Sequence, residues 1–154
     1  MNPLGRLKRV DPATWVAFGL VALHACWTTR LQWDIHRGLG TSSYDVGLYD
    51  QGVWLMSRFK APFVTLMGRN LMGDHASLVL VLLVPLYWLV PGTETLLAVQ
   101  AVVVAAGAIP LFFLARKLLG SRVIAVAFVA VWLMNPATTS NRSGAMPAGS
   151  RRPW

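Results

Sequence analysis

The chain has few charged residues for its length. Asp, Glu, Lys and Arg make up 13% of its 154 residues, whereas an ordinary soluble domain carries about 25%. A single cysteine, Cys26, excludes an intrachain disulfide. The sequence also lacks a phosphate-binding glycine loop, a CxxC pair and the HExxH and GxSxG motifs. The soluble enzyme classes that depend on these motifs therefore have no support.

Hydrophobic residues are abundant instead, at 55% of the chain, and the net charge is +8. A soluble protein of this size could not bury so much apolar surface. The basic residues lie between the apolar runs, and cytoplasmic loops of membrane proteins are enriched in Lys and Arg in the same way. They do not form a pattern typical of nucleic-acid binding. We therefore expect an all-α integral membrane protein, with several passes through the cell membrane and no affinity for nucleic acid.

Four apolar runs predict three to four hydrophobic helices. We expect these helices at about 13–30, 77–90, 95–115 and 121–136. Residues 13–136 would form the membrane domain, and the short basic segment 1–12 would be a cytoplasmic tail. Residues 137–154 are rich in Ser, Thr, Gly, Pro and Arg without periodicity, which predicts a disordered tail.

A polar segment of nearly balanced charge, about 31–76, separates the first two runs and is expected to be an extracytoplasmic loop. Within it, residues 45–59 predict an amphipathic helix on the membrane surface. Its apolar stripe would consist of Val46, Tyr49, Val53 and Met56. Ser42 and Asp45 have the spacing of a capping box at the start of this helix.

The run at 77–90 leaves two threadings open. If all four runs span the bilayer, Arg116, Lys117 and Arg122 fall outside, against the positive-inside rule. If 77–90 is instead a re-entrant or half-buried helix, these three residues return to the cytoplasm with the N-terminus. The second threading fits better, because about 14 residues are fewer than the roughly 20 that a spanning helix needs.

The densest group of residues that could carry chemistry runs from Tyr44 to Gln51. Asp45 and Asp50 are candidate catalytic carboxylates, acting as general base towards a hydroxyl or binding a divalent cation. Tyr44, Tyr49 and Gln51 are candidate substrate contacts. Since each helical residue turns about 100°, the two carboxylates would point about 140° apart and would not share one ion. The structural alternative is that Asp45 caps the helix while Asp50 faces water.

Three polar residues accompany the apolar runs. Asp74 and His75 precede the run at 77–90 and could bind a phosphate or relay a proton, or could simply anchor the interface. His24 lies inside the first run, where a polar side chain is costly in lipid and should face a neighbouring helix.

Several segments together resemble a family of uncharacterised bacterial multi-pass membrane proteins. They are Tyr44 to Gln51, Leu71 to Ser77, Pro85 to Trp88, Leu114 to Gly120, and Asn135 with Pro136. The family's plan resembles GT-C glycosyltransferases, which use lipid-linked sugars and carry an acidic motif in the first extracytoplasmic loop. The resemblance implies that Asp45 and Asp50 occupy that motif, with Asp74 and His75 in the following surface segment. Family members are longer, and the arginine-rich tail departs from their pattern.

Two hypotheses of different class follow. The first is an enzyme, the N-terminal portion of a glycosyltransferase that uses a polyprenyl-phosphate sugar at the outer face, with no cofactor unless a divalent cation takes part. The second is a non-enzymatic assembly partner or transporter component, held by lipid and by other membrane proteins. A third hypothesis is that the chain is a truncated, inactive fragment, because the continuation expected from the family is missing after Pro136.

Overall fold

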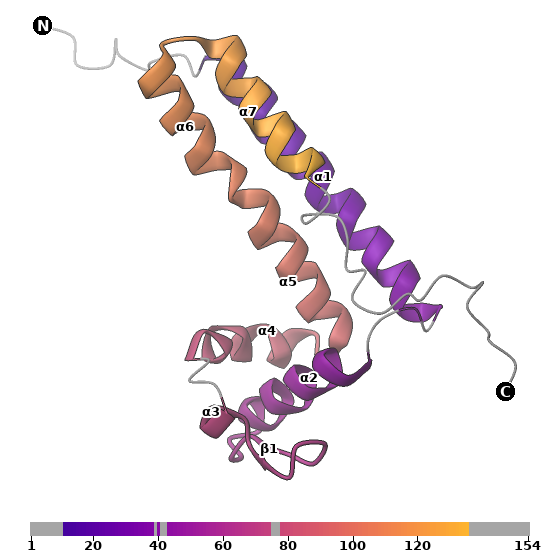
Figure 1. Cartoon of the computed structure of the whole chain (residues 1–154). Coiled ribbons are helices and arrows are strands. Elements are labelled where there is room, and N and C mark those ends of the chain that lie inside the picture. Colours follow the sequence, from indigo (N-terminus) through magenta and orange to yellow (C-terminus); the bar gives the residue numbers. More distant parts are fainter. Residues whose placement is uncertain (1–10, 39, 41–42, 75–77, 136–154) are drawn as a thin grey trace, which may run out of the picture. The chain divides into compact units, whose positions relative to one another are not determined.

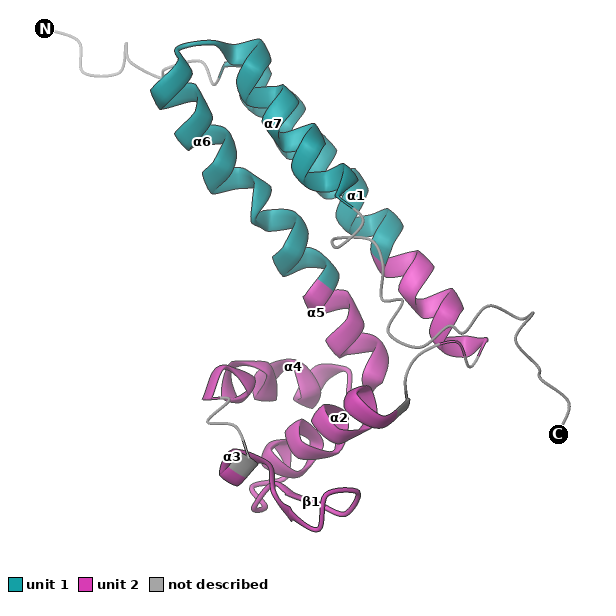
Figure 2. Ribbon diagram, in the orientation of Figure 1, with its two compact units in different colours: residues 1–28, 101–139 teal, residues 29–100, 140–154 magenta. Residues whose placement is uncertain are grey.

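The computed structural model describes residues 11–38, 40, 43–74 and 78–135. The chain divides into two compact units (Figure 2). Unit 1 takes residues 1–28 and 101–139, and unit 2 takes residues 29–100 and 140–154. The segments predicted as a disordered tail and, apart from its last two residues, as a cytoplasmic tail lie outside the described residues. The described part is mostly helical, which confirms the expectation of a mainly helical chain.

The first helix, α1, spans Pro12–Arg37 and continues well beyond the predicted end at residue 30. Asp11 precedes it, and its Oδ1 accepts a hydrogen bond of 3.2 Å from the backbone N–H of Ala13. Proline at the first helical position suits this start, because the missing N–H would be unpaired there. Polar residues after Trp27 lower the mean hydropathy of the last turns of α1, so a hydropathy profile ends the helix too early. Thr28 and Gln32 nevertheless continue the buried face of the helix at helical spacing.

The second long apolar segment forms two consecutive helices, which are separated by a break at Gly107. Helix α5 covers Thr93–Ala106 and α6 covers Ala108–Leu119. The interruption at Gly107 precedes Pro110 by three residues, and a proline ring clashes with the carbonyl four residues earlier. Together Thr93–Leu119 is long and apolar enough to cross a membrane. Only 28% of its most apolar window is buried, whereas the core helix of a soluble protein would be mostly covered.

Helices α6 and α7 form a hairpin (Figure 1). Gly120 ends α6 in the left-handed conformation, with φ 63°, as glycine commonly does after a helix. Ser121 then caps α7, Arg122–Met134, by accepting a 3.4 Å hydrogen bond from the N–H of Ile124. At 13 residues, α7 is one of the two shorter apolar helices among those described.

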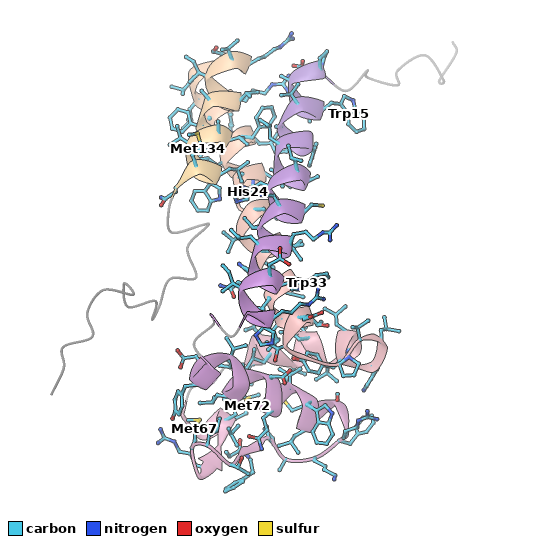
Figure 3. All side chains as sticks on the ribbon, turned by 90° about the vertical axis from the view of Figure 1, so that its right-hand side faces the viewer. Trp15, His24, Trp33, Met67, Met72 and Met134 are labelled. Carbon is cyan, nitrogen blue, oxygen red and sulfur yellow. The ribbon has the colours of Figure 1, made fainter. Side chains whose placement is uncertain are left out.

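Small residues form much of the core of unit 1, and large apolar residues cover its outside. The core consists of Ala17, Val21, Ala25, Ala105, Ala108, Phe112, Ala115, Ala125, Val129 and Leu133. By contrast, Trp15 is 65% exposed and its indole points away from the other helices (Figure 3). Small residues at helix contacts with bulky apolar residues outside are the arrangement of helices packed in lipid.

Unit 2 is built around α2, Ser43–Ser57, which is the helix predicted over 45–59. A two-stranded antiparallel hairpin follows, with β1 Phe63–Val64 paired to β2 Arg69–Asn70. The all-α expectation did not include this hairpin, because two-residue strands are too short to produce an alternating pattern. The short helix α3, Leu71–Asp74, comes next.

The apolar run predicted at 77–90 is a short two-part helix. The 3-10 turn η2, Leu78–Leu83, leads into α4, Val84–Leu89, with six residues each. The pair is about 20 Å long at rises of roughly 2.0 and 1.5 Å per residue. That length is well short of the roughly 30 Å hydrocarbon core of a bilayer.

Helix α2 packs between the hairpin and α4 (Figure 1). Its buried positions are Leu48, Gly52, Val53 and Ser57, of which only Val53 belongs to the predicted stripe. Tyr49, expected in that stripe, is 38% exposed. The difference arises at Gly52, where the missing side chain lets Leu71 approach the helix backbone. The apolar surface of α2 is therefore covered by protein on two sides rather than presented as one stripe.

Candidate functional site

A hollow of about 180 Å³ opens beside the first turns of α2. Its lining residues are Tyr44, Asp45, Leu48, Tyr49, Met67, Arg69 and Leu71. The two tyrosines and Asp45 come from α2, where residues four apart share a face. Met67, which Figure 3 labels, and Arg69 come from the hairpin, and we call the whole the Asp45 hollow.

The chemistry of the Asp45 hollow is amphipathic. Asp45 supplies a carboxylate, Arg69 a guanidinium, and Tyr44 and Tyr49 two phenols, over an apolar floor that includes Leu48 and Leu71. Both floor leucines are nearly fully buried, at 7% and 2% exposure. A guanidinium binds phosphate well, and phenols both donate and accept hydrogen bonds. The hollow can therefore bind a polar, anionic group at its rim.

Asp50 lies on another side of α2 and has a different partner. The Tyr87 hydroxyl of α4 donates a hydrogen bond of 2.6 Å to its Oδ1. Tyr87 is only 2% exposed, and burial, together with the Asp50 carboxylate, raises the pKa of its phenol. The phenol therefore keeps its proton and links α4 to α2.

Gln51 connects α2 to the hairpin. Its Oε1 accepts hydrogen bonds from the backbone N–H of Thr65, at 3.2 Å, and from the Thr65 hydroxyl, at 3.1 Å. The sequence cluster from Tyr44 to Gln51 thus divides in space. Asp45 and the tyrosines meet in the hollow, whereas Asp50 and Gln51 bind neighbouring elements, in keeping with the angular separation expected between Asp45 and Asp50.

The predicted pair Asp74–His75 lies at the edge of the described residues. Asp74 is the last residue of α3, and His75 lies outside the described residues. In the described ranges, no three His, Cys, Asp or Glu side chains gather where they could hold a metal ion.

Two residues of this region were not singled out from the sequence. Arg69 lines the hollow only because the hairpin returns it to α2, and no pattern in the sequence announces that return. Tyr87 carried a usable signal, since it is the one phenol in the apolar run. A buried tyrosine hydroxyl usually finds a partner.

Residues 35–143, more than two thirds of the chain, match the family described as "Predicted membrane protein (DUF2079)". The chain belongs to this family. The matched range contains the Asp45 hollow, the Asp50–Tyr87 pair and the candidate membrane span Thr93–Leu119. The comparisons with curated proteins and with solved structures found no match. The family assignment agrees with the uncharacterised membrane protein family expected from the sequence.

Proposed function

We propose that this member of the predicted membrane protein family binds the headgroup of a lipid-linked sugar phosphate in the Asp45 hollow and transfers the sugar to a hydroxyl. The observation that supports the proposal most is the hollow itself, where one carboxylate, one guanidinium and two phenols meet over an apolar floor. The resemblance to GT-C glycosyltransferases points to the same substrate class.

Each polar group has a role in this reaction. The Arg69 guanidinium pairs with the donor phosphate, and the phenols of Tyr44 and Tyr49 hydrogen-bond the sugar hydroxyls. Asp45 removes the proton from the acceptor hydroxyl as its oxygen bonds to the anomeric carbon. The bond from that carbon to the phosphate oxygen breaks, and polyprenyl phosphate leaves with the electron pair.

A threading of the chain through the membrane supports this location. The Asp11 carboxylate lies 2.9 Å from Nη2 of Arg116 and 2.8 Å from Nε of Arg122. These ion pairs hold the α6–α7 turn beside the start of α1. The positive-inside rule would place the α6–α7 turn and the start of α1 on the cytoplasmic side. The segment between the end of α1 and the start of α5 then faces outside.

The two ends of that outer segment also meet. Nε1 of Trp33 donates a 2.9 Å hydrogen bond to the carbonyl of Glu94, and Arg37 forms an ion pair of 2.9 Å with the Glu94 carboxylate. Helix α1 therefore ends where α5 begins. This closed loop supports the proposal that 77–90 does not cross the bilayer.

The test uses the whole chain in lipid nanodiscs, with polyprenyl-phosphate hexoses as donors. Asp45→Asn should reduce sugar transfer by about 10²–10⁴-fold while native mass spectrometry still detects donor binding. Arg69→Gln should weaken donor binding itself. Asp34→Asn, an exposed carboxylate on α1, is the matched control. Equal binding and transfer by Asp45→Asn and Asp34→Asn would remove the proposal.

A second candidate function is assembly with another membrane protein. In unit 1 a cavity of about 450 Å³ is lined by Leu20, Leu23, His24, Trp27, Ala130, Leu133 and Met134. Nε2 of His24 is buried and has no hydrogen-bond partner in the described part of the chain. A helix bearing a hydroxyl or amide could fill the cavity and satisfy this atom. His24→Leu should then abolish copurification of a partner, whereas Cys26→Ser should not.

A further inference from the structure

The run from Leu78 to Val90 contains no charged residue, yet most of it is not covered by protein. Leu78, Leu82 and Leu89 are 70%, 73% and 79% exposed. The opposite side of the same helix, with Tyr87 at 2% exposure, packs against α2. Large apolar side chains exposed together along one side of a helix mark a place where lipid or an apolar partner lies.

The position of this helix in the chain indicates which phase that is. Only Val90, Pro91 and Gly92 separate α4 from Thr93, where the candidate membrane span begins. The turn is fixed, because the Thr95 hydroxyl donates a 2.6 Å hydrogen bond to the Val90 carbonyl. A helix attached so closely to a membrane-crossing helix must lie near the membrane boundary.

An aromatic pair lies at the edge of the same surface. The rings of Phe59 and Trp88 are 6.0 Å apart, and Nε1 of Trp88 donates a 2.8 Å hydrogen bond to the Ser57 carbonyl. Phe59 is 88% exposed and has a positive φ of 57°. Such backbone is costly for a residue with a side chain and tends to persist where function needs it. Here it presents a bare phenyl ring to the surroundings.

The charges next to this pair are positive. Arg58 and Lys60 flank Phe59 and are exposed, and the Arg58 guanidinium lies 5.9 Å from the ring centre of Trp54. Aromatic and basic residues together are typical of the headgroup region of a bilayer, and basic residues near the surface are attracted to anionic lipid. The carboxylate that α4 does contact, Asp50, lies on the covered side.

We propose that the exposed face of η2 and α4, with Phe59 and Trp88 at its edge, is an interfacial surface that inserts into a bilayer containing anionic phospholipid. The leucines enter the boundary between headgroups and acyl chains, about 5–10 Å deep. Arg58 and Lys60 pair with lipid phosphates. Helix α2 then rests on this layer. The surface does not depend on the chemistry of Asp45.

Site-directed spin labelling of the whole chain tests this surface. Cys26→Ser removes the native thiol, and single labels are placed at Leu82→Cys, Leu89→Cys and Leu66→Cys. Leu66 is the matched control, because it is a leucine 57% exposed on the hairpin, which lies on the other side of α2 from α4 (Figure 1). In nanodiscs, oxygen collides with labels in lipid, whereas a water-soluble nickel complex collides with labels in water.

The expected result is a several-fold higher ratio of oxygen to nickel collisions at positions 82 and 89 than at 66. In phosphatidylglycerol discs these two labels should lie deeper than in phosphatidylcholine discs, and Arg58→Gln with Lys60→Gln should remove that difference. Three results would overturn the proposal. They are equal ratios at all three positions, exclusion of both probes from 82 and 89 by a protein partner, and a label at 82 near the bilayer centre.

Discussion

The hydroxyl of Tyr87 donates a 2.6 Å hydrogen bond to the carboxylate of Asp50, across 37 positions of the chain. One partner comes from an apolar run and the other from the polar segment, so the bond joins the two parts of unit 2 that differ most in composition. It also explains why a carboxylate of the acidic cluster is absent from the Asp45 hollow. Asp50 binds α4 through Tyr87, whereas Asp45 lines the hollow.

Removing this hydroxyl should destabilise unit 2. In Tyr87→Phe the ring still fills its buried site, but Asp50 loses its donor. A hydrogen bond to a charged group contributes about 1.5–3 kcal/mol, so the free energy of unfolding should fall by roughly that amount. Thermal unfolding in detergent measures the change. Tyr44→Phe, whose side chain is 55% exposed, is the control and should unfold almost like the parent chain.

The same pair predicts a pH dependence at the alkaline end. Burial and the Asp50 carboxylate raise the pKa of Tyr87 above its ordinary value of 10.0. The stabilisation of the fold by the Tyr87–Asp50 hydrogen bond is therefore fully present below pH 10. It is lost as pH rises further, because the unfolded chain releases the proton there and the folded chain does not. Stability measured from pH 8 to 11 should decline more steeply in the parent chain than in Tyr87→Phe. Parallel curves would contradict the assignment.

The helices were largely predictable because long apolar runs bounded by polar or glycine residues indicate helices. The limits of that signal appear at α1, where the prediction ended at about residue 30 although the helix continues to Arg37. Inside a helix, polar residues on one face are compatible with a buried opposite face. A hydropathy profile averages the residues of all helix faces, so it cannot distinguish a helix with one polar face from a polar segment.

The candidate site was predictable only in part, because it depends on contacts between distant segments. The angle between Asp45 and Asp50 follows from helix geometry alone, and it correctly separates them. The return of Arg69 to the hollow depends on a hairpin with two-residue strands, which leaves no periodic trace. The partner of Asp50 comes from another helix, and nothing in the spacing of the acidic cluster specifies it.

A pair of glycines on α2 gives opposite predictions for the same substitution. A Cβ at Gly52 would collide with Cδ2 of the buried Leu71, whereas at Gly47 it would meet only Cδ1 of Leu66 at 3.9 Å, an ordinary contact. Gly52→Ala should therefore cost about 1–3 kcal/mol by overpacking. Gly47→Ala should stabilise the helix by about 0.5–1 kcal/mol. Chemical denaturation of both variants measures the contrast.

Gly52→Ala has a further consequence, since Leu71 also lines the Asp45 hollow. Pushing this side chain outward should weaken donor binding as well as stability, and Gly47→Ala should leave binding intact. Donor binding that is retained by a destabilised Gly52→Ala chain would show that the hollow does not take the ligand.

The ion pairs of Asp11 should stabilise unit 1. The Asp11 side chain is 12% exposed, and its partners Arg116 and Arg122 are 35% and 68% exposed. Exposed pairs contribute about 0.2–1 kcal/mol, whereas breaking a buried pair costs about 3–5 kcal/mol. Asp11→Asn should cost an intermediate amount, and Arg116→Gln more than Arg122→Gln because Arg116 is less exposed. Thermal unfolding with Asp34→Asn as control measures the order, and the reverse order would contradict the role given to burial.

Phe59→Gly should separate stability from membrane insertion. A side chain in left-handed backbone costs about 1–2 kcal/mol, and a ring that is 88% exposed contributes little packing in return. The glycine variant should therefore match or exceed the parent chain in detergent stability. In anionic nanodiscs, the same variant should place a label at Leu89 at a shallower depth, because the interfacial surface has lost its most exposed ring. If the label depth stays unchanged while stability rises, Phe59 does not anchor the chain in lipid.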